Sequence, residues 1–354
     1  MSERVSPAKE LSVDGSDDAV NELYLERGWT DGLPIVAPTP ARVRAMVEGS
    51  GREATEIIAE IVPRRGVATV EAIAINAVMA GCRPDYMPVV IAAVQAVTDE
   101  AFNLQGIQLT TSPVSPLIMV NGPIVKRIDL NSGTGVFGPG RRANATIGRA
   151  LRLVLQNIGG ASAGQMDRAV QGHPGKYTLC IAENEAESPW EPLHVEMGYK
   201  PEDDVVTLFG AVSVISTCDH TSQSAESMIN ILGGSMVSTG LNAPYFGGPC
   251  LMVLCPEHAN FLASRGYSKQ QLRTALFERA KLPRQAMDVS PDWLQLTRSH
   301  RPQQFADLSR DFDMFVSPED IRIVVAGGGG PHSSFVPNWS DAVNPTARLV
   351  SMPK

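Results

Sequence analysis

The stretch DLNSGTGVFGPGRRANATIGRALRLVLQNIGG, residues 129–160, passes from a glycine-rich loop into an amphipathic segment and closes on a glycine pair. The loop contains Gly133, Gly135, Gly138 and Gly140, and glycine lets the backbone take positive φ and approach a ligand closely. Apolar side chains then recur at helical spacing, which predicts a helix with one face in the core: Ile147, Leu151, Val154 and Ile158.

The start of this predicted helix is the first candidate binding site. A helix N-terminus offers unpaired N–H groups and the positive end of its dipole, so it favours phosphate or carboxylate. Two arginines at this end oppose the dipole, and a bound anion would remove the conflict. No Gly-Lys-Ser/Thr follows, so this is not a Walker phosphate loop, nor is it a GxGxxG fingerprint. We expect a small anion to be bound by Gly138, Gly140, Arg141, Arg142 and Asn144; the alternative is a structural turn whose arginines pair with acids elsewhere.

Outward from this stretch, short apolar runs alternate with helical patterns. Strands are predicted at residues 57–62, 107–111, 117–121, 176–182, 205–214, 249–254 and 321–326, and helices at 70–81, 84–97 and 268–281. Several strands are continuous apolar runs, which indicates buried sheet. The sequence therefore predicts an α/β fold with mostly buried mixed or parallel sheet and helices packed on its faces. Residues 1–18 are expected to form a flexible arm, and 19–354 one large domain or two intimate lobes with a boundary near residues 160–175.

Composition excludes several classes of protein. The 354 residues carry a net charge of −8, so no basic surface is expected for nucleic acid. No apolar run reaches 18 residues, so no membrane span or membrane partner is expected. The polar N-terminus lacks the apolar core of a secretory signal, and five cysteines at irregular spacing fit reduced thiols. We predict a cytoplasmic protein, assembled as a homo- or hetero-oligomer.

Polar residues at the ends of predicted strands are the candidates for chemistry. Cys218, Asp219 and His220 follow one strand, and His332 follows the glycine run 327–330 after another. His220 is a candidate general base because its ordinary pKa lies near neutrality, and Cys218 is a candidate thiol. The alternative is that Asp219 and His220 cap the helix that follows. His332 and Lys176, which precedes a strand, are further candidates for substrate binding.

Cys82 is a second candidate nucleophile. It lies beside Arg83 at the start of a predicted helix, and both a cation and a helix N-terminus lower a thiol pKa. The alternative is a small buried side chain, which is the usual role of a free cysteine. The other cysteines, Cys180, Cys250 and Cys255, lie in apolar strands and are expected in the core.

A metal site is a weaker possibility. On an extended segment over residues 189–196, His194 and Glu196 would point to the same side and supply two ligands. Asp219, His220 or His332 would have to complete the set. Neither HExxH nor CxxC is present, so the sequence requires no cofactor, although a divalent metal stays open.

Four longer motifs resemble one poorly characterised bacterial family: GWTDGLPIVAPT at 28–39, NAVMAGCRPDYMPVVIAA at 76–93, FGPGRRANATIGRA at 137–150 and AENEAESPWEPLHVE at 182–196. Members of that family resemble the large partners of short proteins that carry a Sec/Cys-Gly-Ser-Cys motif. The resemblance implies thiol or selenol chemistry shared with a small partner. This chain has no Cys-Gly-Ser-Cys of its own, so the partner would supply that centre.

Three hypotheses follow from these residues. The first is an enzyme acting on a small anionic substrate by thiol-dependent lyase or reductase chemistry, which we favour over hydrolysis. The second is a metal-dependent hydrolase or hydro-lyase with a His/Asp/Glu site. The third is a non-catalytic scaffold for a small redox protein, suggested by the absence of a complete catalytic motif.

Overall fold

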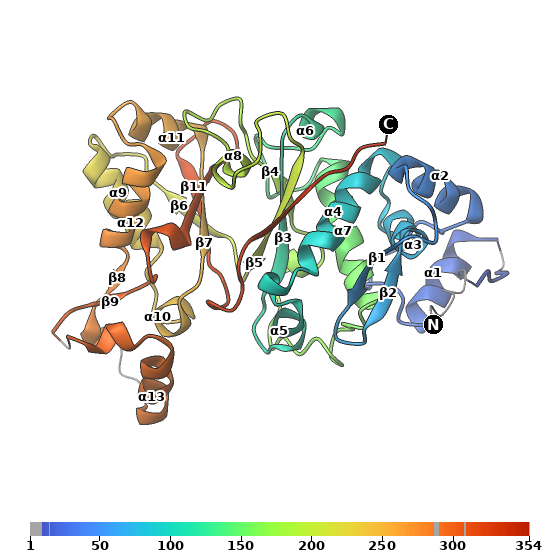
Figure 1. Cartoon of the computed structure of the whole chain (residues 1–354), viewed down its shortest axis with the longest axis horizontal. Coiled ribbons are helices and arrows are strands. Elements are labelled where there is room, and N and C mark those ends of the chain that lie inside the picture. Colours follow the sequence, from blue (N-terminus) through green and yellow to red (C-terminus); the bar gives the residue numbers. More distant parts are fainter. Residues whose placement is uncertain (1–8, 14, 287–289, 308, 354) are drawn as a thin grey trace.

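The computed structural model describes residues 9–13, 15–286, 290–307 and 309–353, and it confirms the predicted α/β class. Two four-stranded mixed sheets are present, each with helices on one side (Figure 1). The first has the order β12-β5-β3-β4 and the second β10-β7-β11-β6. Their strands are β3 (Ser115–Asn121), β4 (Cys180–Ala182), β5 (Val205–Ala211), β12 (Thr346–Leu349), β6 (Ile215–Cys218), β7 (Cys250–Leu254), β10 (Ile321–Val325) and β11 (His332–Val336).

The two sheets have the same strand plan. In the first, β3 is parallel to β4 and antiparallel to β5, and β12 is antiparallel to β5. In the second, β7 is parallel to β10 and antiparallel to β11, and β6 is antiparallel to β11. The strand after β5 in the chain is β6, which joins the second sheet, and the strand after β11 is β12, which joins the first. Each half of the chain therefore contributes three neighbouring strands to one sheet and exchanges a fourth with the other.

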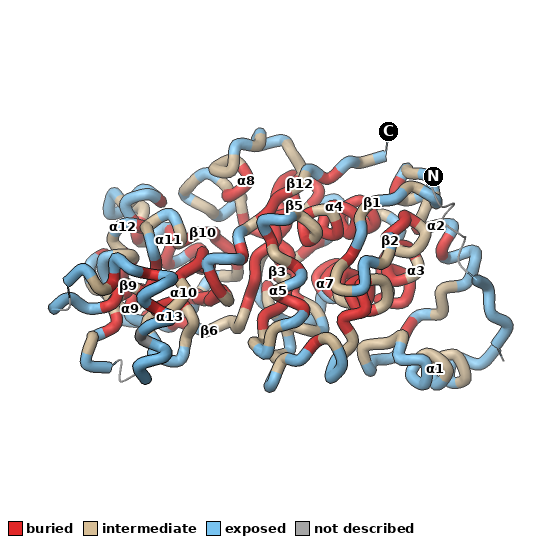
Figure 2. The backbone as a smooth tube through the Cα atoms, turned by 60° about the horizontal axis from the view of Figure 1, so that its bottom comes forward, coloured by how far each residue is buried: buried red, intermediate tan, exposed pale blue. Residues whose placement is uncertain are grey.

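Alternating side chains divide the core into layers, because successive residues of a strand point to opposite faces. One cluster joins the facing sides of the two sheets, with Leu117 and Phe209 from the first and Val253 and Val324 from the second. The opposite faces pack against helices in two larger clusters. Figure 2 shows the central strands as a continuous buried region. The order is helices, sheet, sheet, helices.

The helices on the first sheet are α3 (Val70–Ala80), α4 (Met87–Val97) and α7 (Arg142–Asn157), and those on the second are α9 (Ala225–Ser235), α11 (Pro256–Ala263) and α12 (Lys269–Arg279). The ends of these helices are set by capping side chains and by glycine. The Thr69 hydroxyl accepts from the amide of Ala72 at the start of α3, and Gly81 ends that helix at φ 89°. Ser268 and Gln271 form a capping box on α12.

Smaller elements surround this framework. They are the helices α1 (Asp17–Glu26), α2 (Pro40–Ser50), α5 (Leu104–Leu109), α6 (Ile124–Arg127), α8 (Leu193–Glu196), α10 (Ala243–Phe246) and α13 (Pro291–His300), and the short strand pairs β1 (Ile57–Ile61) with β2 (Gly66–Thr69) and β8 (Lys281–Leu282) with β9 (Phe312–Asp313). Helix α13 projects from the second half of the molecule (Figure 1). Among the described residues, no helix combines the length and apolar character needed to cross a bilayer.

Three local expectations need correction or delimitation. The strand predicted at 107–111 is wrong, because Asn103 caps the helix α5 by accepting from the amide of Gly106 at 3.1 Å. The extended segment predicted through residue 196 is also wrong, because residues 193–196 form α8. Of the predicted arm, residues 1–8 and 14 lie outside the described residues, and Asp17 already belongs to α1. Residues 160–175 connect α7 to β4 of the first sheet.

Candidate functional site

Three ligand-type side chains converge where β6 ends and β11 begins. Cys218 is the last residue of β6 and pairs across the ladder with His332, the first residue of β11. The imidazole rings of His220 and His332 meet edge to face with centroids 5.4 Å apart. The Cys218 sulfur and one nitrogen from each ring all lie within 4.8 Å of one another, and all three residues are exposed. We call Cys218, His220 and His332 the Cys-His-His cluster.

The spacing of the Cys-His-His cluster is close to that of a metal site. A tetrahedral zinc ion with bonds of about 2.0–2.3 Å places its ligand atoms roughly 3.3–3.8 Å apart. The ligand atoms of the cluster lie within 4.8 Å of one another, which is somewhat farther apart than in such a zinc site. Rotation of the side chains to other rotamers would close the difference. A thiolate and two imidazoles are ligands that suit zinc. Because the three residues are exposed, a bound ion would keep a position open to solvent.

Asp219 has a structural role between two members of the cluster. Its Oδ1 accepts from the amides of Thr221 and Ser222, each at 3.0 Å, which forms the turn that carries His220. Burial raises the pKa of this carboxyl, but these hydrogen bonds outweigh it, so the pKa lies below its ordinary value. These contacts support the alternative in which Asp219 shapes the turn, and its catalytic role stays a prediction.

A buried polar layer lies behind the Cys-His-His cluster, and the sequence did not reveal it. Ser333 follows His332 on β11, and its hydroxyl lies 2.8 Å from His258 Nδ1 and donates to the Cys255 sulfur at 3.7 Å. His258 Nε2 faces the backbone carbonyl of Asp219 at 3.3 Å. A carbonyl only accepts, so Nε2 carries the proton in this contact.

Cys255 is the second titratable side chain in this layer. It is the N-cap of α11, and its sulfur accepts from the amide of His258 at 3.5 Å. Burial raises the pKa of the Cys255 thiol, but the contacts with His258 outweigh it and leave the pKa below its ordinary value. Burial lowers the pKa of His258, but Cys255 and Asp219 outweigh it and raise the pKa. Sequence reasoning placed Cys255 in the core as a strand residue and missed this pair.

The first sheet provides an internal comparison for the Cys-His-His cluster. Its equivalent ladder pair is Val205, the first residue of β5, with Leu349, the last residue of β12. Neither can bind a metal. The shared strand plan therefore does not by itself place metal-binding side chains at the end of this strand pair. Their presence on β6 and β11 is specific to the second sheet.

The predicted nucleophile Cys82 lies in the hydrophobic core. Its side chain is buried, and its sulfur donates to the carbonyl of Thr146 at 3.3 Å. Burial raises the pKa of the Cys82 thiol to about 12, despite the positive charges of Arg142 and Arg149. The expectation that Arg83 and a helix start would lower this pKa is wrong, because desolvation dominates.

The arginines of the predicted anion loop have protein partners. Arg141 contacts both carboxylate oxygens of Asp129, at 2.9 and 3.0 Å, in an exposed pair. Arg142 Nε donates to the carbonyl of Gly81 at 2.9 Å. Asn144 is buried and bonds to residue 131 and to the carbonyl of Cys180. These contacts favour the structural alternative.

The same loop does approach the Gly327–Gly330 turn that precedes His332. The amide of Gly327 donates to the carbonyl of Ser132 at 2.8 Å. A Cβ at Gly328 would lie 2.0 Å from the Thr134 hydroxyl, so glycine is required at this contact. Gly138 and Gly140 are exposed in the same loop. The two glycine-rich segments of the sequence analysis, residues 133–140 and 327–330, therefore pack against each other, although they connect elements of different sheets.

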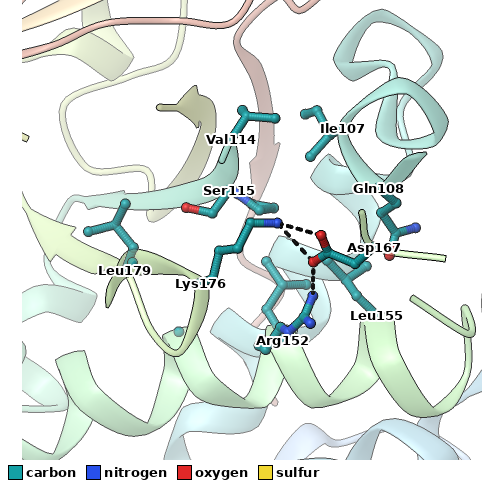
Figure 3. A pocket seen from close by; sticks show the side chains of 13 residues that line it. Ile107, Gln108, Val114, Ser115, Arg152, Leu155, Asp167, Lys176 and Leu179 are labelled. Carbon is teal, nitrogen blue, oxygen red and sulfur yellow. Dashed lines mark hydrogen bonds and ion pairs between the residues drawn. The ribbon is translucent and has the colours of Figure 1, made fainter. Parts of the chain in front are cut away.

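The predicted substrate-binding residue Lys176 is paired with an acid. Lys176 contacts both oxygens of Asp167, at 2.8 and 3.0 Å, and Arg152 reaches the same carboxylate at 3.3 Å (Figure 3). The cavity beside them is about 30 Å³, the space of one water. Burial lowers the pKa of Lys176.

His194 and Glu196 do not form a ligand pair. Residues two apart on a helix lie about 200° apart around its axis. Glu196 accepts from Arg273 at 2.7 Å and lies 3.5 Å from Lys269. The ring of His194 is fully buried, with its Nδ1 3.9 Å from the carboxylate of Glu185.

No protein-family model matches this chain, and no curated protein matches it. The resemblance to partners of Sec/Cys-Gly-Ser-Cys proteins therefore stays a prediction.

Proposed function

We propose that the chain is a metal-dependent enzyme, a hydrolase or hydro-lyase, whose divalent cation is held by the Cys-His-His cluster. The observation that carries this proposal is the approach of three ligand atoms to within 4.8 Å at an exposed strand end. Three protein ligands with a fourth position open to solvent are typical of catalytic zinc, whereas structural zinc has four.

The environment favours zinc over copper. Copper electron-transfer sites also use two histidines and a cysteine, but they add a weak axial ligand and an apolar shell. Cys218, His220 and His332 are all exposed rather than enclosed in an apolar shell. Bound zinc would polarise a substrate oxygen or lower the pKa of a bound water.

The protein residues would divide the remaining tasks. The Asp219 turn holds His220, and the strand pairing holds Cys218 against His332. The hydrogen bond from His258 to the Asp219 carbonyl fixes the backbone between the two β6-side ligands. Such outer contacts orient metal ligands and affect affinity by about 10–100-fold. An oxygen of a small anionic substrate suits the open position.

A thiol-dependent lyase or reductase, with or without a small Cys/Sec partner, is the second candidate. It is favoured by one observation, the exposure of Cys218 beside His220, since the chain's other cysteines are buried. Cys82 no longer supports it. The two candidates make opposite statements about Cys218: a ligand is protected by metal, whereas a nucleophile must remain free.

Cobalt substitution tests the proposal directly. The full-length protein is treated with chelator and titrated with Co²⁺ and Zn²⁺. We expect one equivalent to bind, with a thiolate-to-cobalt absorption band that disappears in Cys218→Ser. His332→Ala and His220→Ala should each weaken zinc binding by more than about 100-fold, since a direct ligand matters more than its outer contacts.

His300→Ala is the matched control, because His300 is exposed on α13, where its ring contacts that of Phe246. It should bind metal as the wild type does. Binding that is absent, or that survives Cys218→Ser and His332→Ala together, would remove the metal-dependent proposal. In that case, loss of activity on alkylation of Cys218 would support the thiol candidate.

A further inference from the structure

A large polar cleft lies in the other half of the molecule, on the exposed side of α7. It has a volume of about 950 Å³, within the usual range for sites of small organic ligands. Its walls are the loop 27–31 after α1, the turn between β1 and β2, one face of α7, and the loop 162–177. Figure 1 shows α1, β2 and α7 in the first half, whereas β6 and β11 of the Cys-His-His cluster belong to the second.

The charge of this cleft is opposite to that of the chain. The whole sequence carries −8, but the cleft is lined by four cations, Arg27, Arg64, Arg152 and Lys176, and by two carboxylates. One of these, Asp31, is already neutralised by a two-bond pair with Arg149, at 2.8 Å for each bond. Cations are therefore in clear excess around the cavity.

The second carboxylate cannot neutralise its neighbours. Asp167 is shared between Arg152, at 3.3 Å, and Lys176, at 2.8 Å (Figure 3). Burial lowers the pKa of Lys176, and the nearby Arg152 lowers it further, against the opposing effect of Asp167. Two cations and one carboxylate leave a positive charge at the inner wall of the cleft.

Arg64 adds a cation that has no acid partner among the described residues. It is exposed in the β1–β2 turn, and its methylene stem packs so closely on Gly160 that a Cβ there would lie 2.3 Å from Arg64 Cδ. This contact holds the side chain beside the cleft. Because no acid of the described chain holds this guanidinium, it can form a bidentate hydrogen bond with a phosphate or carboxylate of a ligand.

We propose that this cleft is a second binding site, for a small organic anion that presents a phosphate or carboxylate group to Arg64, Arg152 and Lys176. Trp29 and Tyr177 line the same cleft and would flank the body of the ligand. The site is independent of the proposed metal chemistry. A ligand here would act as an effector or a bound cofactor, because no residue of the Cys-His-His cluster lines the cleft.

Titration with two probe anions tests this inference. Inorganic pyrophosphate and citrate are each titrated into the full-length protein at fixed ionic strength, followed by calorimetry. We expect saturable one-to-one binding of at least one probe, and the better probe identifies phosphate or carboxylate as the preferred group. Arg64→Gln should weaken that binding by about tenfold or more while the thermal midpoint stays unchanged, because this side chain has no ion pair in the fold.

Arg44→Gln is the matched control, since Arg44 is an exposed arginine on α2 that does not line the cleft. It should bind as the wild type does, and so should Cys218→Ser, which separates this site from the metal site. Absence of saturable binding of both probes, or equal binding by the Arg64→Gln and Arg44→Gln variants, would overturn the inference. The first result shows that no anion site exists, and the second that only the general charge of the protein attracts anions.

Discussion

His332 is the direct cross-strand partner of Cys218, and the two residues come from strands on either side of the whole β7–β10 segment. Opposed side chains in an antiparallel ladder have Cβ atoms only about 5 Å apart, so backbone pairing alone brings the imidazole to the thiol. The turn after Cys218 then adds His220. A site assembled this way leaves no compact sequence motif.

Thiol accessibility gives the first prediction. Iodoacetamide should modify Cys218 much faster than Cys82, because Cys218 is exposed and burial raises the pKa of Cys82 to about 12. At pH 8 only about one Cys82 side chain in ten thousand would be thiolate. Mass spectrometry of peptides over time measures both rates. Saturating zinc should protect Cys218, and rapid labelling of Cys82 in the folded protein would contradict the assignment.

Asp31→Asn should destabilise the protein strongly. The Asp31 and Arg149 side chains are 4% and 13% exposed, so the substitution leaves a nearly buried guanidinium without its partner. Such losses cost about 3–5 kcal/mol, measurable by urea unfolding. Asp129→Asn is the control, because its pair with Arg141 is exposed and worth less than about 1 kcal/mol. Equal effects of the two substitutions would show that burial does not distinguish these pairs.

The effect of Asp31→Asn should also depend on pH. Burial raises the pKa of Asp31, but the hydrogen bonds and charge of Arg149 outweigh it, so the folded-state pKa lies below the unfolded value. The carboxylate therefore stabilises the fold fully above the unfolded pKa of about 4, and this contribution is lost as pH falls through the lowered folded pKa. Unfolding curves of wild type and variant should converge at the acidic end and separate above pH 5.

The buried pair behind the Cys-His-His cluster predicts a shift in a histidine titration. Cys255→Ala should lower the pKa of His258, because burial continues to disfavour the imidazolium once the contacts with Cys255 are removed. In the wild type the raised pKa stabilises the fold fully below the unfolded histidine value of about 6.5, and this is lost as pH rises through the folded pKa. NMR of the imidazole protons measures the change, with His300 as the unaffected reference. An unchanged His258 titration would show that Cys255 does not raise this pKa.

Local patterns in the sequence predicted much of the framework and part of the site. Helix α7 follows its glycine loop, α3 ends at Gly81, and Cys218, His220 and His332 do lie at strand ends. Local patterns do not encode which strands pair, so neither the strand exchange nor the meeting of the three cluster residues could be derived.

The errors have the same origin. Apolar periodicity over six residues does not separate a strand from a short helix, which is why α5 and α8 were missed. The expected pKa of Cys82 failed because neighbouring charges are visible in the sequence and burial is not. The His258 contacts with Cys255 and Ser333 depend on β11 lying beside β7.

The exchange of β12 gives the last prediction. This strand belongs to the final segment of the chain but completes the sheet of the first half, where it pairs with β5. The hydroxyl of Thr346 also donates to the carbonyl of Ala96 at the end of α4, at 2.7 Å.

Deleting residues 346–354 should therefore remove a strand from a sheet far away in sequence and expose the α4–β5 contact. We expect a lower thermal midpoint and faster proteolysis within residues 87–121, measured by circular dichroism and limited chymotrypsin digestion, since this segment holds Phe102, Leu104 and Leu109 but no lysine or arginine. Leu349→Ala is the control, because this side chain is half exposed and its truncation should change the midpoint little. A deleted chain whose first half resists protease as the full chain does would show that the exchanged strand is not needed to hold the first sheet together.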